Sequence, residues 1–229
     1  MADARAKLVI IVVGIGLDRA ASEAAIERLP AAVVLAIDAY ADRADAWARG
    51  ARRAGHELLA TVTLQEVDSN LYDRGPRALR ASASADENGR RLETVLGAFP
   101  GYVGMLAVGG EVLEPNDGAF EVLLGAARSR GLLLVDGTES KPSPLARWTP
   151  SPDAPVVRAD MVIDPAGALA IDRQLADLEK IAGARSNGVA MAQAYPATLE
   201  RLRAWMSALD ERRYVMAPVS ALLATEGAR

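Results

Sequence analysis

The sequence contains no cysteine and only one histidine, His56, among its 229 residues. The absence of cysteine excludes a disulfide framework, a thiolate metal site and a cysteine nucleophile. A zinc site of the usual kind takes several histidine ligands. A single histidine would have to be completed by carboxylates alone, so the composition disfavours zinc chemistry.

The sequence also has no strong excess of charge and no long apolar run. It carries 26 basic against 30 acidic residues, a net charge of −4, which gives no electrostatic footprint for nucleic acid. No stretch approaches the roughly 18 to 20 apolar residues that a transmembrane helix needs. The N-terminal residues show a short apolar run without a small-residue cleavage site, so we expect no signal peptide in the chain as given.

What the sequence does have is a core: 51% of its residues are hydrophobic. The first apolar segment runs unbroken from Leu8 to Val13 and stops at the glycine-rich turn around Gly14 and Gly16. An unbroken, β-branched run of this kind is typical of a strand buried on both faces in a parallel sheet. The segment therefore predicts the first strand of an α/β fold.

Further apolar segments alternate with helical patterns along the chain. Alternation of this kind predicts parallel strands joined by right-handed crossovers, and about eight strands in this length favour a barrel. We therefore predict an irregular TIM-like (β/α) barrel of about 7–8 parallel strands, forming one domain over 1–229 with its core at about 7–223. The expected strands lie at 8–16, 32–38, 56–64, 102–108, 132–136, 156–164, 189–194 and 214–219, and the expected helices at 18–28, 41–54, 84–98, 117–130, 168–184 and 196–212.

In such folds the working residues follow the carboxyl ends of the strands. These positions form a polar and partly acidic set, suited to catalysis or to binding sugar hydroxyls. A single one of them is more often a helix cap or a solvated loop residue. The set comprises Gly14, Gly16, Asp38, Gln65, Glu66, Gly109, Gly110, Glu111, Asp136, Thr138, Glu139, Asp164, Gln193, Tyr195 and Ser220.

The order of several short motifs resembles a known family. The markers are Leu29–Pro30, then "GHE" at 55–57, Gly75–Pro76, Val103–Gly104, Asp136 with Thr138, Pro196 with Thr198 and Leu199, and "PVS" at 218–220. Together they resemble the divergent polysaccharide deacetylases, relatives of the NodB-type carbohydrate esterases, over nearly the whole chain. The resemblance implies a barrel fold and a carbohydrate-related role in the bacterial cell envelope.

The departures from the family pattern concern its catalytic residues. The resemblance implies paired aspartates after the first strand, where this chain has Val13 and Gly14. It implies an Asn-His pair after the fourth strand, where the chain reads 107–110 AVGG, and a Gly-His-Pro near the seventh, where it reads 193–196 QAYP. Deacetylation in the family implies a metal held by aspartate and histidines, with a carboxylate base. We therefore expect no metal and no cofactor here.

These departures favour a catalytically inactive deacetylase-like domain that binds a cell-envelope glycan or a protein partner. Small residues in place of catalytic ones would leave an open mouth, with aromatic side chains as stacking faces. The expected binding residues are Gly14, Gly16, Gln65, Gly109, Gly110, Thr138, Trp148, Gln193 and Tyr195, with Tyr72 as a further aromatic candidate.

Two alternatives stay open. In the first, Glu66 and Asp136 form a rebuilt acid/base pair in an active carbohydrate hydrolase or deacetylase, since two carboxylates suffice for glycoside chemistry. Such a pair could also hold Mg²⁺ or Ca²⁺. In the second, less favoured, Gly14-x-Gly16 and Asp38 bind NAD(P) in an oxidoreductase, but Arg19 replaces the third glycine of that fingerprint.

Location follows from the resemblance alone. Family members imply a periplasmic or cell-envelope protein, whereas this chain shows no export signal. Either the signal is missing from the sequence given or this member is cytoplasmic.

Overall fold

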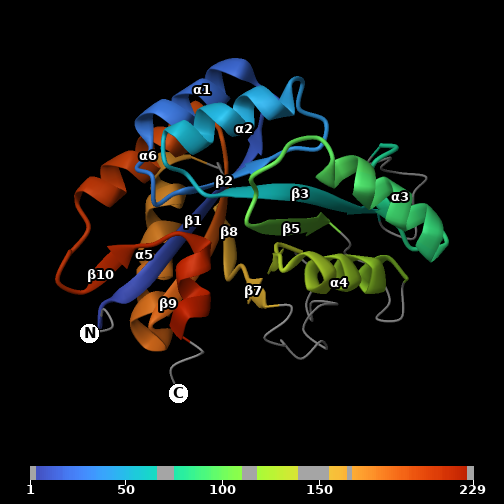
Figure 1. Cartoon of the computed structure of the whole chain (residues 1–229). Helices are drawn as coiled ribbons and strands as arrows, with labels where there is room; N and C mark the ends of the chain where they lie inside the picture. Colours follow the sequence, from blue (N-terminus) through green and yellow to red (C-terminus); the bar gives the residue numbers. More distant parts are fainter. Residues whose placement is uncertain (1–3, 66–74, 110–117, 139–154, 164–166, 226–229) are drawn as a thin grey trace. The chain divides into compact units, whose positions relative to one another are not determined.

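The computed structural model describes residues 4–65, 75–109, 118–138, 155–163 and 167–225. Strands and helices alternate along these residues, and the strands pair in parallel, which confirms the predicted α/β fold of the TIM-like barrel type (Figure 1). The elements are β1 Ala6–Ile15, α1 Arg19–Arg28, β2 Val34–Ile37, α2 Ala44–Arg53, β3 Leu58–Gln65, β4 Leu79–Arg80, α3 Ala85–Leu96, β5 Gly104–Gly109, α4 Gly118–Arg130, β6 Leu133–Asp136, β7 Val156–Arg158, β8 Met161–Ile163, α5 Ala168–Arg185, β9 Asn187–Gln193, α6 Pro196–Ser207, β10 Tyr214–Met216 and the 3-10 helix η2 Val219–Thr225.

The chain divides into two compact units. Unit 1 comprises Met1–Leu58 and Ala159–Arg229, and unit 2 comprises Leu59–Arg158. The prediction of one domain over 1–229 is not tested by this division and stays a prediction.

In unit 1, β1 is the central strand. It pairs with β9 along one edge, from Lys7 beside Asn187 to Val13 beside Gln193. Its other edge is shared, because β10 pairs with residues 6–8 and β2 with residues 11–15. The segment Val9–Val12 has no exposed surface, as its unbroken apolar sequence predicts. The carboxyl ends of β1 and β9 therefore lie side by side.

Helix α1 begins and ends where its sequence signals predict. The Asp18 carboxylate accepts a hydrogen bond from the Ala21 N–H at 2.7 Å and caps the helix, as an acidic N-cap residue does. Leu29 follows in an extended conformation, which the residue before a proline favours. The helix thus starts shortly after the carboxyl end of β1.

In unit 2, β3, β5, β6 and β7 pair in that order, and β4 pairs with the end of β3. The two-residue strand β4 lies inside a segment that the sequence analysis leaves as a loop. Ser84 caps α3 by accepting the Glu87 N–H at 3.2 Å. Gly104 opens β5 where a Cβ atom would lie 2.3 Å from the Leu133 carbonyl oxygen. Only glycine fits that position of the sheet.

The strand expected at 156–164 is wrong as one element. The structure forms two strands there, β7 pairing with β6 in unit 2 and β8 pairing with β9 in unit 1. Asp160 separates them: its N–H donates to the Val189 carbonyl at 2.8 Å and its carboxylate accepts the Val189 N–H at 2.9 Å. The polar residue thereby binds the neighbouring strand at a point that hydrophobic pattern alone cannot reveal.

The C-terminal part differs in two further ways. The last long helix, α6, ends at Ser207 instead of near residue 212. The expected strand 214–219 shortens to β10, which is followed by η2.

None of the helices that the structure describes has both the length and the apolar character of a membrane span.

Candidate functional site

The carboxyl ends of β1 and β9 bring together three of the predicted binding residues. A Cβ atom on Gly14 would lie 3.4 Å from Gln193 Oε1, so the two residues are direct neighbours. Tyr195 follows at the N-cap position of α6 and keeps 52% of its surface exposed. We call Gly14, Gln193 and Tyr195 the mouth of unit 1.

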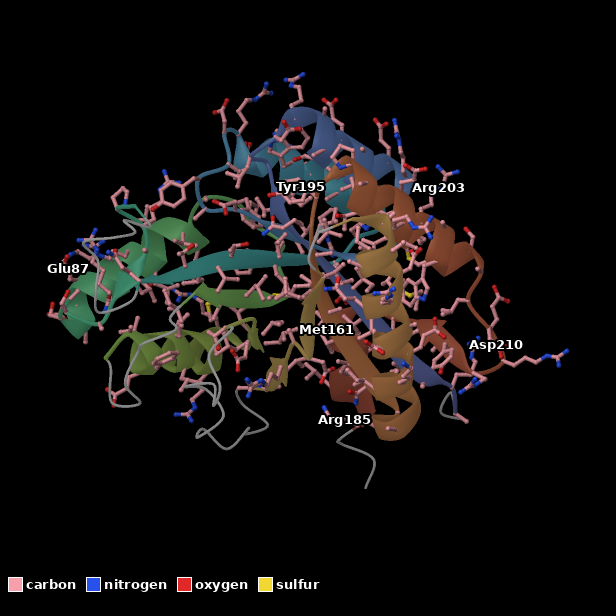
Figure 2. All side chains as sticks on the ribbon, turned by 180° about the vertical axis from the view of Figure 1, so that it is seen from behind. Glu87, Met161, Arg185, Tyr195, Arg203 and Asp210 are labelled. Atoms are coloured by element: carbon pink, nitrogen blue, oxygen red, sulfur yellow. The ribbon has the colours of Figure 1, made fainter. Side chains whose placement is uncertain are left out.

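The mouth opens into a cavity of about 1170 Å³ that runs between α1 and α6. Figure 2 labels Tyr195 at the start of α6 and Arg203 further along it. The cavity, called here the α1–α6 groove, has largely apolar walls with two arginines. Its lining includes Leu17, Asp18, Ala20, Ala21, Ala24 and Arg28 from the α1 side and Pro196, Leu199, Glu200, Arg203, Ala204 and Ser207 from α6.

Gly16 has a packing role. Its φ is +95°, and a Cβ atom there would lie 2.3 Å from Ala41 Cβ and 3.2 Å from Trp47 Cδ1. Its N–H donates to the Ser22 hydroxyl at 2.8 Å. It lines a smaller cavity of about 430 Å³ between α1 and α2 rather than the α1–α6 groove. A binding role for Gly16 stays a prediction, while its backbone conformation already explains why glycine stands there.

A second group of predicted residues lies at strand ends of unit 2. Asp136 ends β6 with 2% exposure, and its Oδ1 accepts hydrogen bonds from the Thr138 N–H at 3.1 Å and hydroxyl at 2.6 Å. Arg158 Nε lies 4.0 Å from Asp136 Oδ2. The carboxylate therefore organises the turn after β6 and lies near a guanidinium group.

Gln65 and Gly109 also belong to this group. Gln65 is 3% exposed, and its Oε1 accepts a hydrogen bond from Arg80 Nε at 2.9 Å. Arg80 is held by Asn88, which exchanges two hydrogen bonds of 2.9 Å with its backbone. Gly109 ends β5 with φ +79° beside Leu64. The sequence analysis missed Arg80 and Asn88, because a two-residue strand gives no periodic signal.

The remaining predicted site residues lie outside the described part of the chain. Their roles stay predictions, including that of Glu66 in the carboxylate pair of the active-hydrolase alternative. These residues are Glu66, Tyr72, Gly110, Glu111, Glu139, Trp148 and Asp164.

His56 is a buried residue of the core, and its surroundings are not those of a metal ligand. It is completely buried, with Nδ1 2.8 Å from the Val33 carbonyl oxygen and Nε2 3.2 Å from the Ile26 carbonyl oxygen. The Ile26 carbonyl would face the N–H of residue 30 in a continuing helix, but Pro30 has none. His56 Nε2 thus stands where the missing donor would be, and both ring nitrogens lie against carbonyl oxygens. This agrees with the sequence analysis, which leaves His56 out of the site.

The expectation that Ser220 lies at the mouth is wrong. Its N–H donates to Glu57 Oε2 at 3.2 Å and its hydroxyl donates to Glu57 Oε1. Lys7 Nζ, at the amino end of β1, donates to the neighbouring Ala221 carbonyl at 2.7 Å. The expectation assumed that β10 reaches the carboxyl rim, but β10 pairs only with the first part of β1.

The residues present do not fit the metal that the family pattern implies. Val13 and Gly14 offer no ligand at the end of β1, and both nitrogens of the chain's one histidine face carbonyl oxygens. Within the described ranges, no three histidine, aspartate or glutamate side chains gather as a metal-binding group. We derive no chemical step through a metal.

One comparison with known proteins identifies a family, and another finds a similar solved structure. The family model described as divergent polysaccharide deacetylase matches residues 10–223. The crystal structure of an uncharacterized protein from Agrobacterium tumefaciens C58 is similar, with 28% sequence identity and a TM-score of 0.89, covering 97% of this chain and 91% of that one. A search of curated proteins gave no match. Because the family model spans nearly the whole sequence, the chain belongs to the divergent polysaccharide deacetylase family.

Proposed function

We propose that this protein is a non-hydrolytic member of its family that binds a glycan of the bacterial cell envelope at the mouth of unit 1. The observation that carries the proposal is the proximity of Gly14 to the Gln193 side chain at the carboxyl ends of β1 and β9. At this mouth the chain offers the Gly14 backbone, the Gln193 amide and the Tyr195 ring in place of metal ligands.

The chemistry of the mouth suits an uncharged, hydroxyl-rich ligand. The exposed Gln193 amide has both a donor and an acceptor, and Gly14 leaves the backbone open to close approach. The Tyr195 ring presents an exposed apolar face with a polar tip. Sugars offer matching hydroxyls and apolar ring faces.

A titration of peptidoglycan fragments and acetylated glucosamine oligomers tests glycan binding. We expect the Tyr195→Ala variant to weaken binding about fivefold, since one exposed stacking contact is worth on the order of 1 kcal/mol. Tyr40, exposed to 39% and absent from the groove lining, gives the matched control Tyr40→Ala, which should bind as the wild type does. Equal affinities for all three proteins would contradict the proposed mouth.

The non-hydrolytic part has its own test. After exposure to Zn²⁺, Mn²⁺, Ni²⁺ and Mg²⁺ and removal of excess ions, we expect well below one metal ion per chain by elemental analysis. Deacetylation of chromogenic acetyl esters should then stay at the background rate. One tightly held ion per chain together with turnover would overturn this part of the proposal.

The active-hydrolase alternative requires Asp136 to act as an acid or base. Its Oδ1 already accepts two hydrogen bonds from Thr138, and Arg158 lies near Oδ2. These contacts favour a structural carboxylate. If the protein did show turnover, an unchanged rate in Asp136→Asn would remove this residue from the mechanism.

The dinucleotide alternative has a specific obstacle at α1. A pyrophosphate would sit at the N-terminus of that helix, where the Asp18 carboxylate already caps it. Asp38, the expected ribose ligand, accepts the Tyr40 N–H at 2.8 Å in a local turn. The Asp18 carboxylate would repel the pyrophosphate, and Asp38 already has a backbone partner.

An envelope location follows for this proposal from family membership alone. Fractionation of cells that carry the natural gene would test it. Recovery of the protein only with cytoplasmic markers would exclude an envelope glycan as the ligand.

A further inference from the structure

The α1–α6 groove extends well beyond the mouth, and the proposed glycan does not account for its far part. Helices α1 and α6 contain 10 and 12 residues, so the groove follows them for about 15 Å at 1.5 Å rise per residue. Both helices start at the ends of neighbouring parallel strands, so they run in the same direction. The groove thus has a mouth end, at Leu17 and Tyr195, and a far end, at Arg28 and Arg203.

Small side chains make the walls of the groove. Ala20, Ala21 and Ala24 line it from α1, and Ala204 lines it from α6. Alanine walls give no hydrogen-bond donors for a sugar, but they let another backbone approach closely. A convex, apolar element therefore fits this part of the cavity better than a glycan.

Large apolar side chains stand exposed at the mouth end. Leu17 keeps 60% of its surface exposed and Tyr195 52%, and both line the groove. Exposed apolar residues that gather in a cavity are a signature of an interaction site, in contrast to scattered ones. They supply contacts for the apolar face of an incoming segment.

Arginines close the far end. Arg28 and Arg203 are both exposed groove residues, one on each helix. Among the described residues, neither has an acidic partner in the ion pairs found. Two acids also line the groove: Asp18 caps α1 at the mouth end, and Glu200 lies between the ends on α6. The far end is therefore cationic and complementary to an acidic group.

The opposite side of α6 is already packed. Arg201 holds Asp172 of α5 through two bonds of 2.7 and 2.6 Å, and Trp205 Nε1 donates to Glu179 at 2.7 Å. These contacts tie α6 to α5 and leave its groove face unpartnered. A second copy of this chain is a poor occupant, because the same face on both copies is concave.

We propose that the α1–α6 groove docks an amphipathic helix of a partner protein, of about three turns, with acidic residues at the end that meets Arg28 and Arg203. Packing a helix into a groove between two helices is a common recognition mode, read through apolar anchors at i, i+3, i+4 and i+7. This inference goes beyond the proposed glycan binding and does not depend on it.

A displayed library of helix-forming peptides of about fourteen residues, long enough for the groove at 1.5 Å per residue, tests the proposal on the full chain. We expect enriched peptides to carry an apolar stripe and acidic residues near one end. Their affinity should fall about tenfold in the double variant Arg28→Gln/Arg203→Gln, since paired charges at an interface contribute on this scale.

Matched variants separate the groove from general effects. Ala204→Trp fills the groove from an exposed position, so it should fold normally by circular dichroism and abolish peptide binding. Arg173→Gln removes an exposed arginine of α5 outside the groove and should leave affinity unchanged.

Three results would overturn the inference: no enriched peptide, enriched peptides without an apolar stripe, or undiminished binding by Ala204→Trp. A dimer of the wild type that Ala204→Trp dissociates would assign the face to a second copy instead. If the wild type bound the peptides but no glycan, only the proposed function would be contradicted.

Discussion

The Gly16→Ala variant is expected to lose about 2 to 5 kcal/mol of unfolding free energy. The left-handed conformation at φ +95° costs an L-residue about 1 to 2 kcal/mol. The new methyl group would also lie only 2.3 Å from Ala41 Cβ and overlap it. Overpacking of this kind costs about 1 to 3 kcal/mol. Urea denaturation with equal m-values measures the difference.

Gly14→Ala is the matched control for this variant. Gly14 has a similar φ of +79°, but its Cβ atom would meet only Gln193 Oε1 at 3.4 Å and Leu17 Cδ1 at 3.9 Å. We expect a loss of only about 1 to 2 kcal/mol, from backbone conformation alone. Equal losses for both glycines would show that the loop around Gly16 adapts and that its contact with Ala41 does not select glycine.

The same pair of variants separates structure from binding. Gly14 lines the α1–α6 groove, whereas Gly16 does not. At a temperature where both variants are folded, Gly14→Ala should weaken glycan binding more than Gly16→Ala does. The sequence presents the two glycines as equivalent, and only their surroundings assign them different roles.

The sequence predicts the fold well where a strong local signal exists. The segment Leu8–Val12 of the apolar run is fully buried as expected, and Asp18 and Ser84 cap helices as their residue types indicate. Local signals fail where pairing is decided by distant residues. Asp160 separates β7 from β8 through its bonds to Val189, which lies 29 residues away in the chain.

The site was predictable only in part, for the same reason. Strand ends can be read from the sequence, so Gly14, Gln193 and Tyr195 were named together and lie together. The arginines of the groove were not named, since Arg28 and Arg203 stand on exposed helix faces that resemble any solvated surface. Their common cavity depends on the packing of α1 beside α6.

The family markers have a structural explanation. His56 of the "GHE" motif lies against the Ile26 carbonyl, in the helix turn just before Leu29–Pro30. Glu57 of the same motif binds Ser220 of "PVS". These contacts join segments from the beginning, middle and end of unit 1. Residues that hold the fold are thus present in this chain, while the catalytic positions of the family pattern carry other residues, which motivates the proposal of a binding role.

His56 is the most sensitive of these contacts, and we expect His56→Ala to lose about 3 to 5 kcal/mol of unfolding free energy. The change removes the ring nitrogens that lie against the Ile26 and Val33 carbonyl oxygens in a fully buried place, and with them the N–H that a neutral imidazole donates to one of the two. An unsatisfied buried acceptor costs about 1 to 3 kcal/mol, and the vacated ring adds a cavity. Because Pro30 has no N–H, the end of α1 cannot compensate.

His56→Gln tests the cause of this loss. The glutamine amide retains a donor, so about half of the loss should be recovered, whereas an apolar residue of similar size, as in His56→Leu, should recover little. Thr94→Ala, at an exposed position of α3, controls for general surface effects and should stay within about 0.5 kcal/mol of the wild type. A His56→Ala variant as stable as the wild type would refute the structural role. The chain's only histidine would then be a candidate for function, and metal and activity measurements on that variant would be needed again.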